Sequence, residues 1–318
     1  MRDHGGNIDW ARSHWGGEDW IDLSTGINRV PYAVQGLPPE CWTMLPTASQ
    51  KARLLRAAQT AFRTDAPGLA IAGAQAAIQM IPRLSAPGLA RILAPTYNEH
   101  AATLTEAGWR VEEHSTFAKL RGADLAVIVN PNNPDGRSFH PTDLAALSRD
   151  VGRLVIDESF ADPMPELSVL ERSDLERILV LRSFGKFWGL AGIRLGFVFG
   201  DAVDIATLQQ MAGPWPVSGP AIEIGIRALG DTGWRDATVK RLHADAERLD
   251  GMAARCGWTA LGGTPLFRLY DCGDSKAAQD QLARHRIWSR IFPYSDRWMR
   301  LGLPGAEEEW DRLSEAIG

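Results

Sequence analysis

Between residues 68 and 200 the chain alternates short apolar runs with longer segments of helical periodicity. The runs read as buried strands and are GLAIAG, ARILAP, ADLAVIVN, RLVIDE, RILVLRSF and RLGFVFG. Helical segments lie between them at 75–84, 99–107 and 141–149. Because a strand without polar alternation must be covered on both faces, this order predicts an α/β fold, with a mostly parallel sheet flanked by helices.

The pattern changes after the segment MAGPWPVSGP. Two helical stretches come next, followed by two strands with a helix between them, at 221–229, 234–256, 266–270 and 297–301. This order is typical of a smaller α+β domain. We therefore expect a large domain over 41–215, a small α+β domain over 216–318, and an N-terminal segment, 1–40, that joins the small domain.

Composition limits the possible partners. A chain of 318 residues with 45% hydrophobic and 23% charged residues is typical of a globular protein with a large core. The net charge of −5 argues against a nucleic acid as the main partner, because nucleic-acid binders usually carry a basic face. No His, Cys or carboxylate cluster has the spacing of a metal site, so no metal is expected.

Cysteine usage and the N-terminus bear on location. Cys41, Cys256 and Cys272 are few, scattered and odd in number, which indicates no disulfide framework. No apolar run is long enough for a membrane span, and the start, MRDHGGNIDWARSHWG, has neither the basic nor the apolar region of a signal peptide. We expect a cytoplasmic protein with no membrane partner.

Chemically useful residues follow the predicted strands. In open α/β sheets ligands bind at the carboxyl ends of the strands. Residues 73–75 enter a helix there and could offer backbone N–H groups to an anion. Tyr97 could stack on a flat ligand, NPNNPDG presents amide side chains on a rigid turn, and Asp157 ends an apolar strand. Each of these, taken alone, has a structural alternative: a turn, core packing, or an ion pair.

One lysine stands out in LRSFGKFWGLAGIRLGF, at 181–197. Lys186 lies among Phe184, Phe187 and Trp188, and an apolar surrounding lowers the pKa of a lysine. A neutral lysine is a nucleophile toward aldehydes. A Schiff-base lysine, an upstream carboxylate for a pyridinium, an asparagine between the carboxylate and an anion-binding turn, and Arg194 together indicate pyridoxal 5′-phosphate as the cofactor.

The same motifs carry a resemblance. NPNNPDG, DESF and SFGKFWGLAGIRLGF resemble those of the class I and II aminotransferases, in the fold-type I superfamily of pyridoxal-phosphate enzymes. The resemblance implies a large cofactor-binding domain, a small domain and a homodimer. It also implies that Lys186 forms the Schiff base, that Asp157 pairs with the pyridinium, that Asn133 bonds the ring oxygen and that Tyr97 stacks on the ring.

The resemblance extends to the anionic groups of cofactor and substrate. It implies that Ser183 and Arg194 contact the cofactor phosphate, together with the backbone at Ala74 and Gln75. It also implies that Arg300, in DRWMRLGLP, binds the α-carboxylate of the substrate. A planar guanidinium suits that role because it can donate two parallel hydrogen bonds.

The N-terminus narrows the resemblance. HGGN and LSTGIN resemble the corresponding segments of the threonine-phosphate decarboxylases of cobalamin biosynthesis, which are related to the histidinol-phosphate aminotransferases. This implies that the segment contributes to the active site. Gly26, Ile27 and Asn28 would line the substrate pocket, with Asn133 also near the substrate, and His4 and Gly5 would lie near its phosphate.

Three positions depart from the family pattern. Phe160 stands where many relatives have a tyrosine that bonds the cofactor ring, and Gly185 replaces a frequent serine. Leu45 stands where aminotransferase relatives often have a tyrosine that reaches the neighbouring subunit's cofactor. The lysine, the aspartate and the arginine of the pattern are all present.

The resemblance implies an enzyme with a small phosphorylated amino acid as substrate. The activity expected from it is decarboxylation of L-threonine O-3-phosphate to (R)-1-amino-2-propanol O-2-phosphate. The alternative is an aminotransferase that acts on histidinol phosphate or a similar amino-acid phosphate, because the cofactor residues would be the same. A non-catalytic cofactor-binding protein is a third possibility, and the presence of both Lys186 and Asp157 argues against it.

Overall fold

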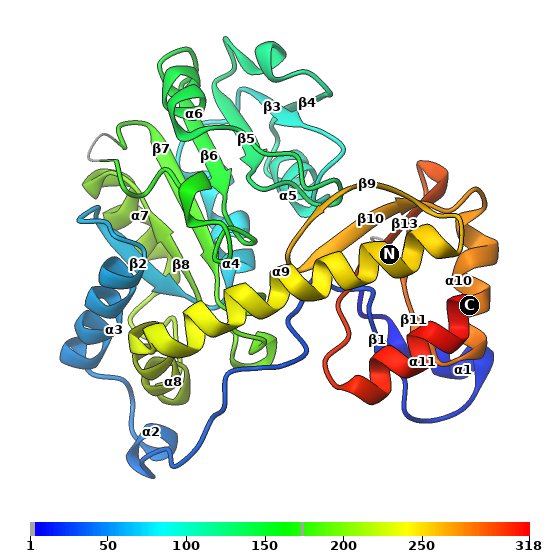
Figure 1. The fold of residues 1–318 in the computed structure, drawn as a ribbon. Helices are drawn as coiled ribbons and strands as arrows, with labels where there is room; N and C mark the ends of the chain where they lie inside the picture. The colour runs from blue at the N-terminus through cyan, green and yellow to red at the C-terminus, as the bar shows by residue number, and fades with distance from the viewer. Residues whose placement is uncertain (1–3, 173–174) are drawn as a thin grey trace. The chain divides into compact units, whose positions relative to one another are not determined.

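The computed structural model describes residues 4–172 and 175–318, and the chain forms two compact units (Figure 1). The first unit comprises Met1–Pro31, Pro134–Arg137 and Trp234–Gly318. The second comprises Tyr32–Asn133 and Ser138–Gly233. The N-terminal residues therefore belong to the same unit as the C-terminal third of the chain.

A seven-stranded sheet forms the centre of the second unit, as its described residues show. Its spatial order is β2-β8-β7-β6-β5-β3-β4. The strands are β2 (Gly68–Ile71), β3 (Leu89–Leu93), β4 (Arg110–His114), β5 (Leu125–Val129), β6 (Arg153–Asp157), β7 (Ile178–Ser183) and β8 (Gly196–Phe199). The pairs from β7 to β4 are parallel, whereas β8 is antiparallel to both of its neighbours. The predicted α/β class with a mostly parallel, mixed sheet is confirmed.

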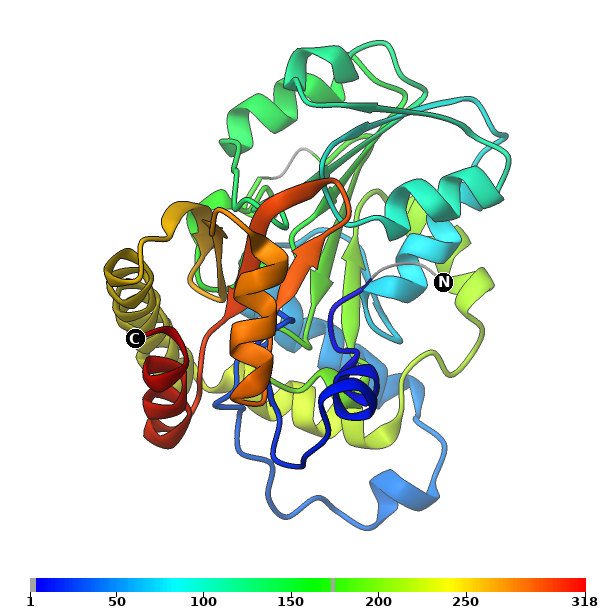
Figure 2. The same cartoon turned by 90° about the vertical axis from the view of Figure 1, so that its right-hand side faces the viewer.

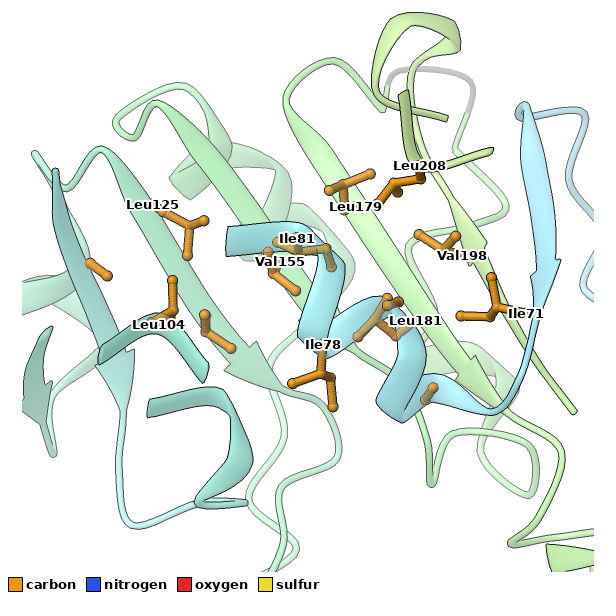
Figure 3. Packing of buried hydrophobic residues seen from close by; sticks show 14 of the residues in the cluster. Ile71, Ile78, Ile81, Leu104, Leu125, Val155, Leu179, Leu181, Val198 and Leu208 are labelled. Carbon is orange, nitrogen blue, oxygen red and sulfur yellow. The ribbon is translucent and has the colours of Figure 1, made fainter. Parts of the chain in front are cut away.

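Both faces of the central strands of this sheet are buried. Leu179 and Leu181 of β7 and Val155 of β6 face a cluster that includes Ile78 and Leu208 (Figure 3). Successive side chains of a strand point to opposite faces, so the residues between them face the other way, and they are also buried. This double burial explains why the strand runs are apolar throughout rather than alternating.

Helices cover the sheet and connect its strands. Those of the second unit are α2 (Glu40–Thr43), α3 (Ala48–Ala61), α4 (Ala74–Met80), α5 (Glu99–Glu106), α6 (Pro141–Ser148), α7 (Ala202–Ala212) and α8 (Gly219–Gly230). Helices α4, α5 and α7 contribute to the cluster in Figure 3. Helix α3 begins with a capping box, in which Thr47 accepts from the backbone N–H of Gln50 and Gln50 accepts from that of Thr47.

The first unit has an antiparallel sheet of four strands, counted over its described residues. Its order is β12-β13-β10-β9, with β9 (Thr259–Thr264), β10 (Phe267–Asp271), β12 (Arg290–Phe292) and β13 (Ser295–Gly302). The short strands β1 (Ile21–Asp22) and β11 (Ile287–Trp288) pair in parallel. Its helices are α1 (Ile8–Trp15), α9 (Thr232–Arg255), α10 (Ser275–Arg284) and α11 (Glu307–Ile317). Figure 2 shows α10 lying along the sheet, next to β13.

The N-terminal segment is built into this unit. The N–H of Leu23 donates to the carbonyl of Trp288 at 2.8 Å, and the N–H of Gly302 donates to the carbonyl of Leu23 at 2.7 Å. A Cβ atom on Gly302 would lie 2.3 Å from the carbonyl oxygen of Thr25. Residues 23–25 therefore lie directly against the end of β13.

The unit boundaries differ from the expected division at residues 40 and 215. Residues 216–233, expected in the small domain, belong to the second unit because α8 packs closely on α3. A Cβ atom on Gly225 would lie 2.7 Å from Leu54 and 2.8 Å from Leu195. Within the part of the chain that the structure describes, no helix is both long enough and apolar enough to cross a membrane.

Candidate active site

The topology of the large sheet collects the predicted site at one edge. Strands β2, β5, β6 and β7 run in the same direction, so their carboxyl ends share an edge, and antiparallel β8 begins at that edge. The register places Asp157 beside Leu181, and it places Ile71 and Ser183 on either side of Gly196. Segments far apart in sequence therefore meet where ligands of α/β sheets bind.

A cavity of about 180 Å³ opens at this edge, within the second unit. It is lined by the residues that the sequence predicted for cofactor binding: Ala74, Gln75, Tyr97, Asn133, Asp157, Ser183, Lys186 and Arg194. The remaining described lining residues are small or apolar, apart from Ser159. The structure thus brings this predicted set together around one space.

Asp157 lies at the bottom of the cavity with a side chain that is 4% exposed. Burial raises the pKa of this carboxyl, but hydrogen bonds from His100 and Ser159 outweigh burial and hold the pKa below its ordinary value. Ser159 donates to Oδ1 through both its backbone N–H and its hydroxyl. The cavity therefore presents a negative charge at neutral pH, which fits a protonated pyridine nitrogen.

His100 was not among the predicted site residues. It lies in the first turn of α5, is 3% exposed, and its Nε2 is 2.9 Å from Oδ2 of Asp157. An ionised carboxylate only accepts hydrogen bonds, so Nε2 of His100 carries the proton. The only signal in the sequence is a histidine at a strand end, three residues after Tyr97, and such a signal is weak without the strand order.

A chain of hydrogen bonds orients the Tyr97 ring. Its hydroxyl donates to Oε1 of Gln75 at 3.1 Å, and Nε2 of Gln75 donates to Oε2 of Glu99 at 2.9 Å. The ring also meets the His100 ring edge-on, with centroids 6.1 Å apart. These contacts fix the orientation of the Tyr97 ring on the cavity wall, which favours stacking on a flat ligand.

The start of α4 and Arg194 lie close together on the cavity wall. Gly73 has φ of +75°, and a Cβ atom there would lie 2.8 Å from Nη2 of Arg194. A Cβ atom on Gly196 would lie 2.6 Å from the backbone nitrogen of Ala74. Glycine at both positions therefore lets the guanidinium and the backbone N–H groups at the helix start come close together. A phosphate group fits this combination.

Lys186 lies on the turn between β7 and β8 and is partly exposed. Its Nζ is 5.5 Å from the centroid of the Phe160 ring. The neighbouring Phe184, Phe187 and Trp188 are buried, and Phe184 stacks on Trp188 with an interplanar angle of 9°. This aromatic packing holds the turn, so that Lys186 is placed at the cavity by a rigid backbone.

Two departures from the family pattern have a structural reading. A Cβ atom on Gly185 would lie 2.9 Å from Cα of Ala191, so a serine at this position would need the following turn to move. Phe160 lines the cavity as an apolar ring without a hydroxyl. Among the described residues of the cavity wall, the amide side chains that could bond a ring oxygen are those of Asn133 and Gln75, and the Gln75 amide already bonds Tyr97 and Glu99.

Arg300 lies in the first unit, on β13, and is 6% exposed. Its Nη2 donates to the carbonyl of Ser24 at 2.6 Å, and its guanidinium carbon is 5.2 Å from the Phe267 ring centroid. Burial lowers the pKa of Arg300 to about 10, and the charge of Arg290 acts in the same direction. Arg290, which sequence reasoning missed, stands opposite Arg300 on β12.

Two like charges opposite each other in a sheet destabilise it unless an anion lies between or beside them. Asp22 counteracts the lowering of the Arg300 pKa, yet the net shift is still downward. The arginine pair in the first unit is therefore suited to a ligand with strong negative charge.

His4 and Gly5 line a second cavity, of about 400 Å³, which lies within the first unit. We call it the basic cavity because its lining includes His4, Lys276 and Arg290. Ser24 and Ser289 are also on its wall. Asn133, in contrast, belongs to the cavity of the second unit.

The LSTGIN segment is firmly placed in the first unit. Gly26 is buried and Ile27 is partly buried. Asn28 is 3% exposed, and its Oδ1 accepts from Nη2 of Arg241 at 2.7 Å and from the backbone N–H of Val30 at 3.0 Å. Asn28 thus ties the segment to α9, a structural function that the sequence did not indicate.

Known proteins resemble this chain over most of its length. The family model for class I and II aminotransferases matches residues 47–317. The chain is 38% identical to the threonine-phosphate decarboxylase of Pseudomonas aeruginosa, over 100% of this chain and 97% of that protein. It is 30% identical to the histidinol-phosphate aminotransferase of Sodalis glossinidius, over 58% of this chain and 57% of that protein.

Solved structures show the same fold. The histidinol-phosphate aminotransferase of Sinorhizobium meliloti, solved in complex with pyridoxal 5′-phosphate, matches with a TM-score of 0.82 and 18% identity, covering 100% of this chain and 94% of that one. The family model covers most of the sequence and the similarity to the Pseudomonas protein extends over its whole length. The chain therefore belongs to the class I and II aminotransferase family.

Proposed function

We propose that this protein is a decarboxylase that converts L-threonine O-3-phosphate to (R)-1-amino-2-propanol O-2-phosphate, a step of cobalamin biosynthesis. The observation that carries the proposal is the 38% identity to a threonine-phosphate decarboxylase over essentially the full length of both chains. The similarity to histidinol-phosphate aminotransferases is lower and covers less of the chain. The N-terminal segment, which resembles that of the decarboxylases, adds support.

The cofactor of this enzyme is pyridoxal 5′-phosphate, which when bound supplies an electron sink for the electrons of a bond broken at the substrate Cα. The residues of the cavity fit it. Asp157, which stays ionised, would pair with the protonated pyridine nitrogen, and Tyr97 would stack on the ring. Lys186 attaches the cofactor and moves a proton at the substrate Cα, and Asn133 bonds the ring oxygen.

The cofactor phosphate is held by Arg194, Ser183 and the backbone N–H groups of Ala74 and Gln75. The close approach that glycine permits at residues 73 and 196 supports this assignment. Because Arg194 also donates to the carbonyl of Ala191 at 3.2 Å, its guanidinium is oriented before any ligand binds. Preorganised donors lose little conformational entropy when they bind an anion.

The substrate is bound by the first unit's arginines and N-terminal segment. Arg300 takes the α-carboxylate, and Gly26, Ile27 and Asn28 shape its surroundings. His4 and Gly5 take the substrate phosphate, as their place on the basic cavity suggests. The opposed pair of Arg290 and Arg300 suits a substrate with two anionic groups better than one with a single carboxylate.

The test of the activity measures carbon dioxide. The purified protein, loaded with pyridoxal phosphate, is incubated with carboxyl-labelled L-threonine O-3-phosphate and no 2-oxo acid. Release of labelled carbon dioxide is expected, with formation of the amino-propanol phosphate. The second candidate function is that of an aminotransferase, which the similarity to the Sodalis protein supports. Amino transfer from histidinol phosphate to 2-oxoglutarate, without release of carbon dioxide, would favour this function over the decarboxylase.

Replacing Arg300 by methionine is expected to raise KM for the substrate about 10- to 100-fold, because a charged hydrogen-bond partner of the carboxylate is lost. The folded-state pKa of Arg300 is below its ordinary value, so the charged form costs stability at neutral pH, and this cost is relieved only as the pH rises through about 10. The methionine variant should therefore melt at the same or a higher temperature without substrate.

The control for this change is Arg297→Met, on the same strand. Arg297 pairs with Asp271 and its side chain is 57% exposed, so its loss should leave KM as it was. Steady-state kinetics and thermal melting of both variants check the prediction. An unchanged KM in the Arg300 variant would remove this residue from the substrate site.

We also propose that the protein is a cytoplasmic homodimer. Trp42, Met44 and Leu45, in and after α2, are 66%, 63% and 64% exposed, an apolar group that a second copy would cover. Helix α2 is itself held tightly, because a Cβ atom on Gly219 would lie 2.1 Å from the carbonyl oxygen of Cys41. All three cysteines are free, in keeping with a reducing compartment.

Trp42→Glu is expected to shift the protein from dimer to monomer, since it places a charge in the apolar group that the dimer covers. Light scattering should give twice the chain mass of 34.9 kDa for the wild type and 34.9 kDa for the variant. Val203→Glu, at a 75% exposed position on α7, is the control and should remain dimeric. A monomeric wild type would contradict the proposal.

A further inference from the structure

Ser289 lies between β11 and β12 on the wall of the basic cavity. The residue is 1% exposed, and its Oγ has no hydrogen-bond partner among the described residues. Its carbonyl oxygen accepts from Nε2 of Gln279, on α10, at 2.9 Å. The backbone of Ser289 is therefore fixed while its hydroxyl is left to bond something else.

An unpaired buried hydroxyl is costly. Leaving such a group without a partner destabilises a protein by about 1–3 kcal/mol, so native structures rarely contain one without a reason. The cost is recovered when a ligand supplies the acceptor. Since the Ser289 hydroxyl lies on a cavity wall, a ligand in that cavity is the partner that the geometry offers.

The charge of the cavity indicates what the ligand is. His4, Lys276 and Arg290 line it, and there is no Asp or Glu among its described lining residues. Acidic groups do lie behind this wall, since Lys276 pairs with Asp280 and the hydroxyl of Ser24 donates to Asp22. The surface that faces the cavity is nevertheless basic, as a dianionic group requires.

We propose that Ser289 is a specificity-determining residue, whose hydroxyl donates a hydrogen bond to the phosphate group of the substrate. This inference rests on the proposed function for the identity of the substrate. Ser289 would distinguish a phosphorylated amino acid from one that ends in a neutral hydroxyl, because only the phosphate offers a charged acceptor at this place. Arg290 and Ser289 both line the basic cavity, so the cavity offers a guanidinium and a hydroxyl donor to the same ligand.

The first experiment measures kinetics of the holoenzyme variant Ser289→Ala. KM for L-threonine O-3-phosphate is expected to rise about 10- to 100-fold with kcat nearly unchanged, because a hydrogen bond to a charged group is lost. Any turnover of unphosphorylated L-threonine should be the same in the variant and the wild type. Ser289→Thr, which keeps the hydroxyl, should restore a KM near that of the wild type. A fall of kcat with unchanged KM would overturn the proposal.

The second experiment does not depend on decarboxylation. Inorganic phosphate is titrated into the holoenzyme, in which the cofactor already fills its own phosphate site, and the melting temperature is followed. The Ser289→Ala variant should melt at the same or a higher temperature without phosphate, because an unpaired hydroxyl has been removed. Its stabilisation by phosphate should be smaller than that of the wild type.

Ser148→Ala is the matched control. Ser148 is 7% exposed on α6, and its hydroxyl donates to the carbonyl of Ala145 at 2.9 Å, so its loss should lower the melting temperature and leave phosphate stabilisation unchanged. If Ser289→Ala also lowers the melting temperature and leaves the stabilisation by phosphate unchanged, the Ser289 hydroxyl is structural and does not bind phosphate. If the wild type releases no carbon dioxide while phosphate still stabilises it more than it stabilises the Ser289→Ala variant, the proposed reaction is wrong and the proposed phosphate site is supported.

Discussion

Replacement of Lys186 by alanine is expected to lower the rate of carbon dioxide release by a factor on the order of 10⁵. The side chain is the only lysine among the described residues that line the cavity of the second unit. In the proposed function, its loss would remove both the covalent attachment of the cofactor and the amine that moves a proton at the substrate Cα. No neighbouring group offers an amine to replace it, since Phe160 and Ala191 are apolar.

Two measurements check this prediction. Carbon dioxide release is compared with that of Lys240→Ala, which changes an exposed lysine on α9 and should keep wild-type activity. Borohydride reduction followed by mass spectrometry should fix the cofactor on the wild-type peptide that contains Lys186, and leave it free in the Lys186→Ala variant. A cofactor fixed on another lysine would contradict the assignment.

Asp157→Asn is expected to lower kcat about 100- to 1,000-fold and to weaken retention of the cofactor. Asparagine has nearly the same shape but no charge, so it cannot hold a proton on the pyridine nitrogen, and the ring becomes a poorer electron sink. The change also leaves His100 opposite an amide instead of a carboxylate. Absorbance of the bound cofactor and single-turnover kinetics measure the two effects.

The control is Asp143→Asn, at an exposed position on α6, which should change neither kcat nor retention of the cofactor.

The pH dependence of cofactor retention adds a second check. Because the pKa of Asp157 is lowered in the folded protein, its contribution to stability is fully present above the ordinary aspartate range and is lost as the pH falls through the lowered value. Cofactor retention should therefore persist in mildly acidic buffer.

In the His100→Ala variant, the pH below which the protein loses its cofactor should be higher than in the wild type. A hydrogen bond from His100 helps to lower the Asp157 pKa, so without it the carboxyl takes up a proton more readily. Retention of the cofactor in the variant should then fail at a pH where the wild type still holds it. If both proteins lose the cofactor at the same acidic pH, the hydrogen bonds from Ser159 alone keep the carboxylate ionised.

Apolar patterning explains why much of the sheet could be predicted. Strands β5, β6 and β7 are buried on both faces, and their runs are apolar along almost their whole length. Strand β4, with the sequence RVEEH, lies at the edge of the sheet and is partly exposed, so it carries no such signal. Helix α3 was also missed, because half of the residues of its sequence, ASQKARLLRAAQTA, are polar and two of its apolar residues, Leu54 and Ala58, are buried, which leaves a weak apolar pattern.

The cofactor residues could be found because each follows a strand. Once Asp157, Lys186 and residues 73–75 are placed at the ends of strands in one sheet, elementary topology puts them at one edge. His100, Arg290 and Ser289 could not be found this way. Their importance depends on which side chain each one meets, and that follows from strand order and register rather than from neighbours in sequence.

The sequence by itself determined the α/β class, the cofactor and the family, because apolar periodicity and short motifs act over a few residues of chain. Only the tertiary structure decided that His100 bonds Asp157, that Arg290 stands opposite Arg300, and that the Ser289 hydroxyl is left without a partner among the described residues. His100 and Asp157 are distant in sequence, the facing of Arg290 and Arg300 follows from the register of β12 and β13, and the state of the Ser289 hydroxyl follows from what surrounds it. They arise because packing must bury apolar faces, and burial fixes which polar groups are paired and which are kept for a ligand.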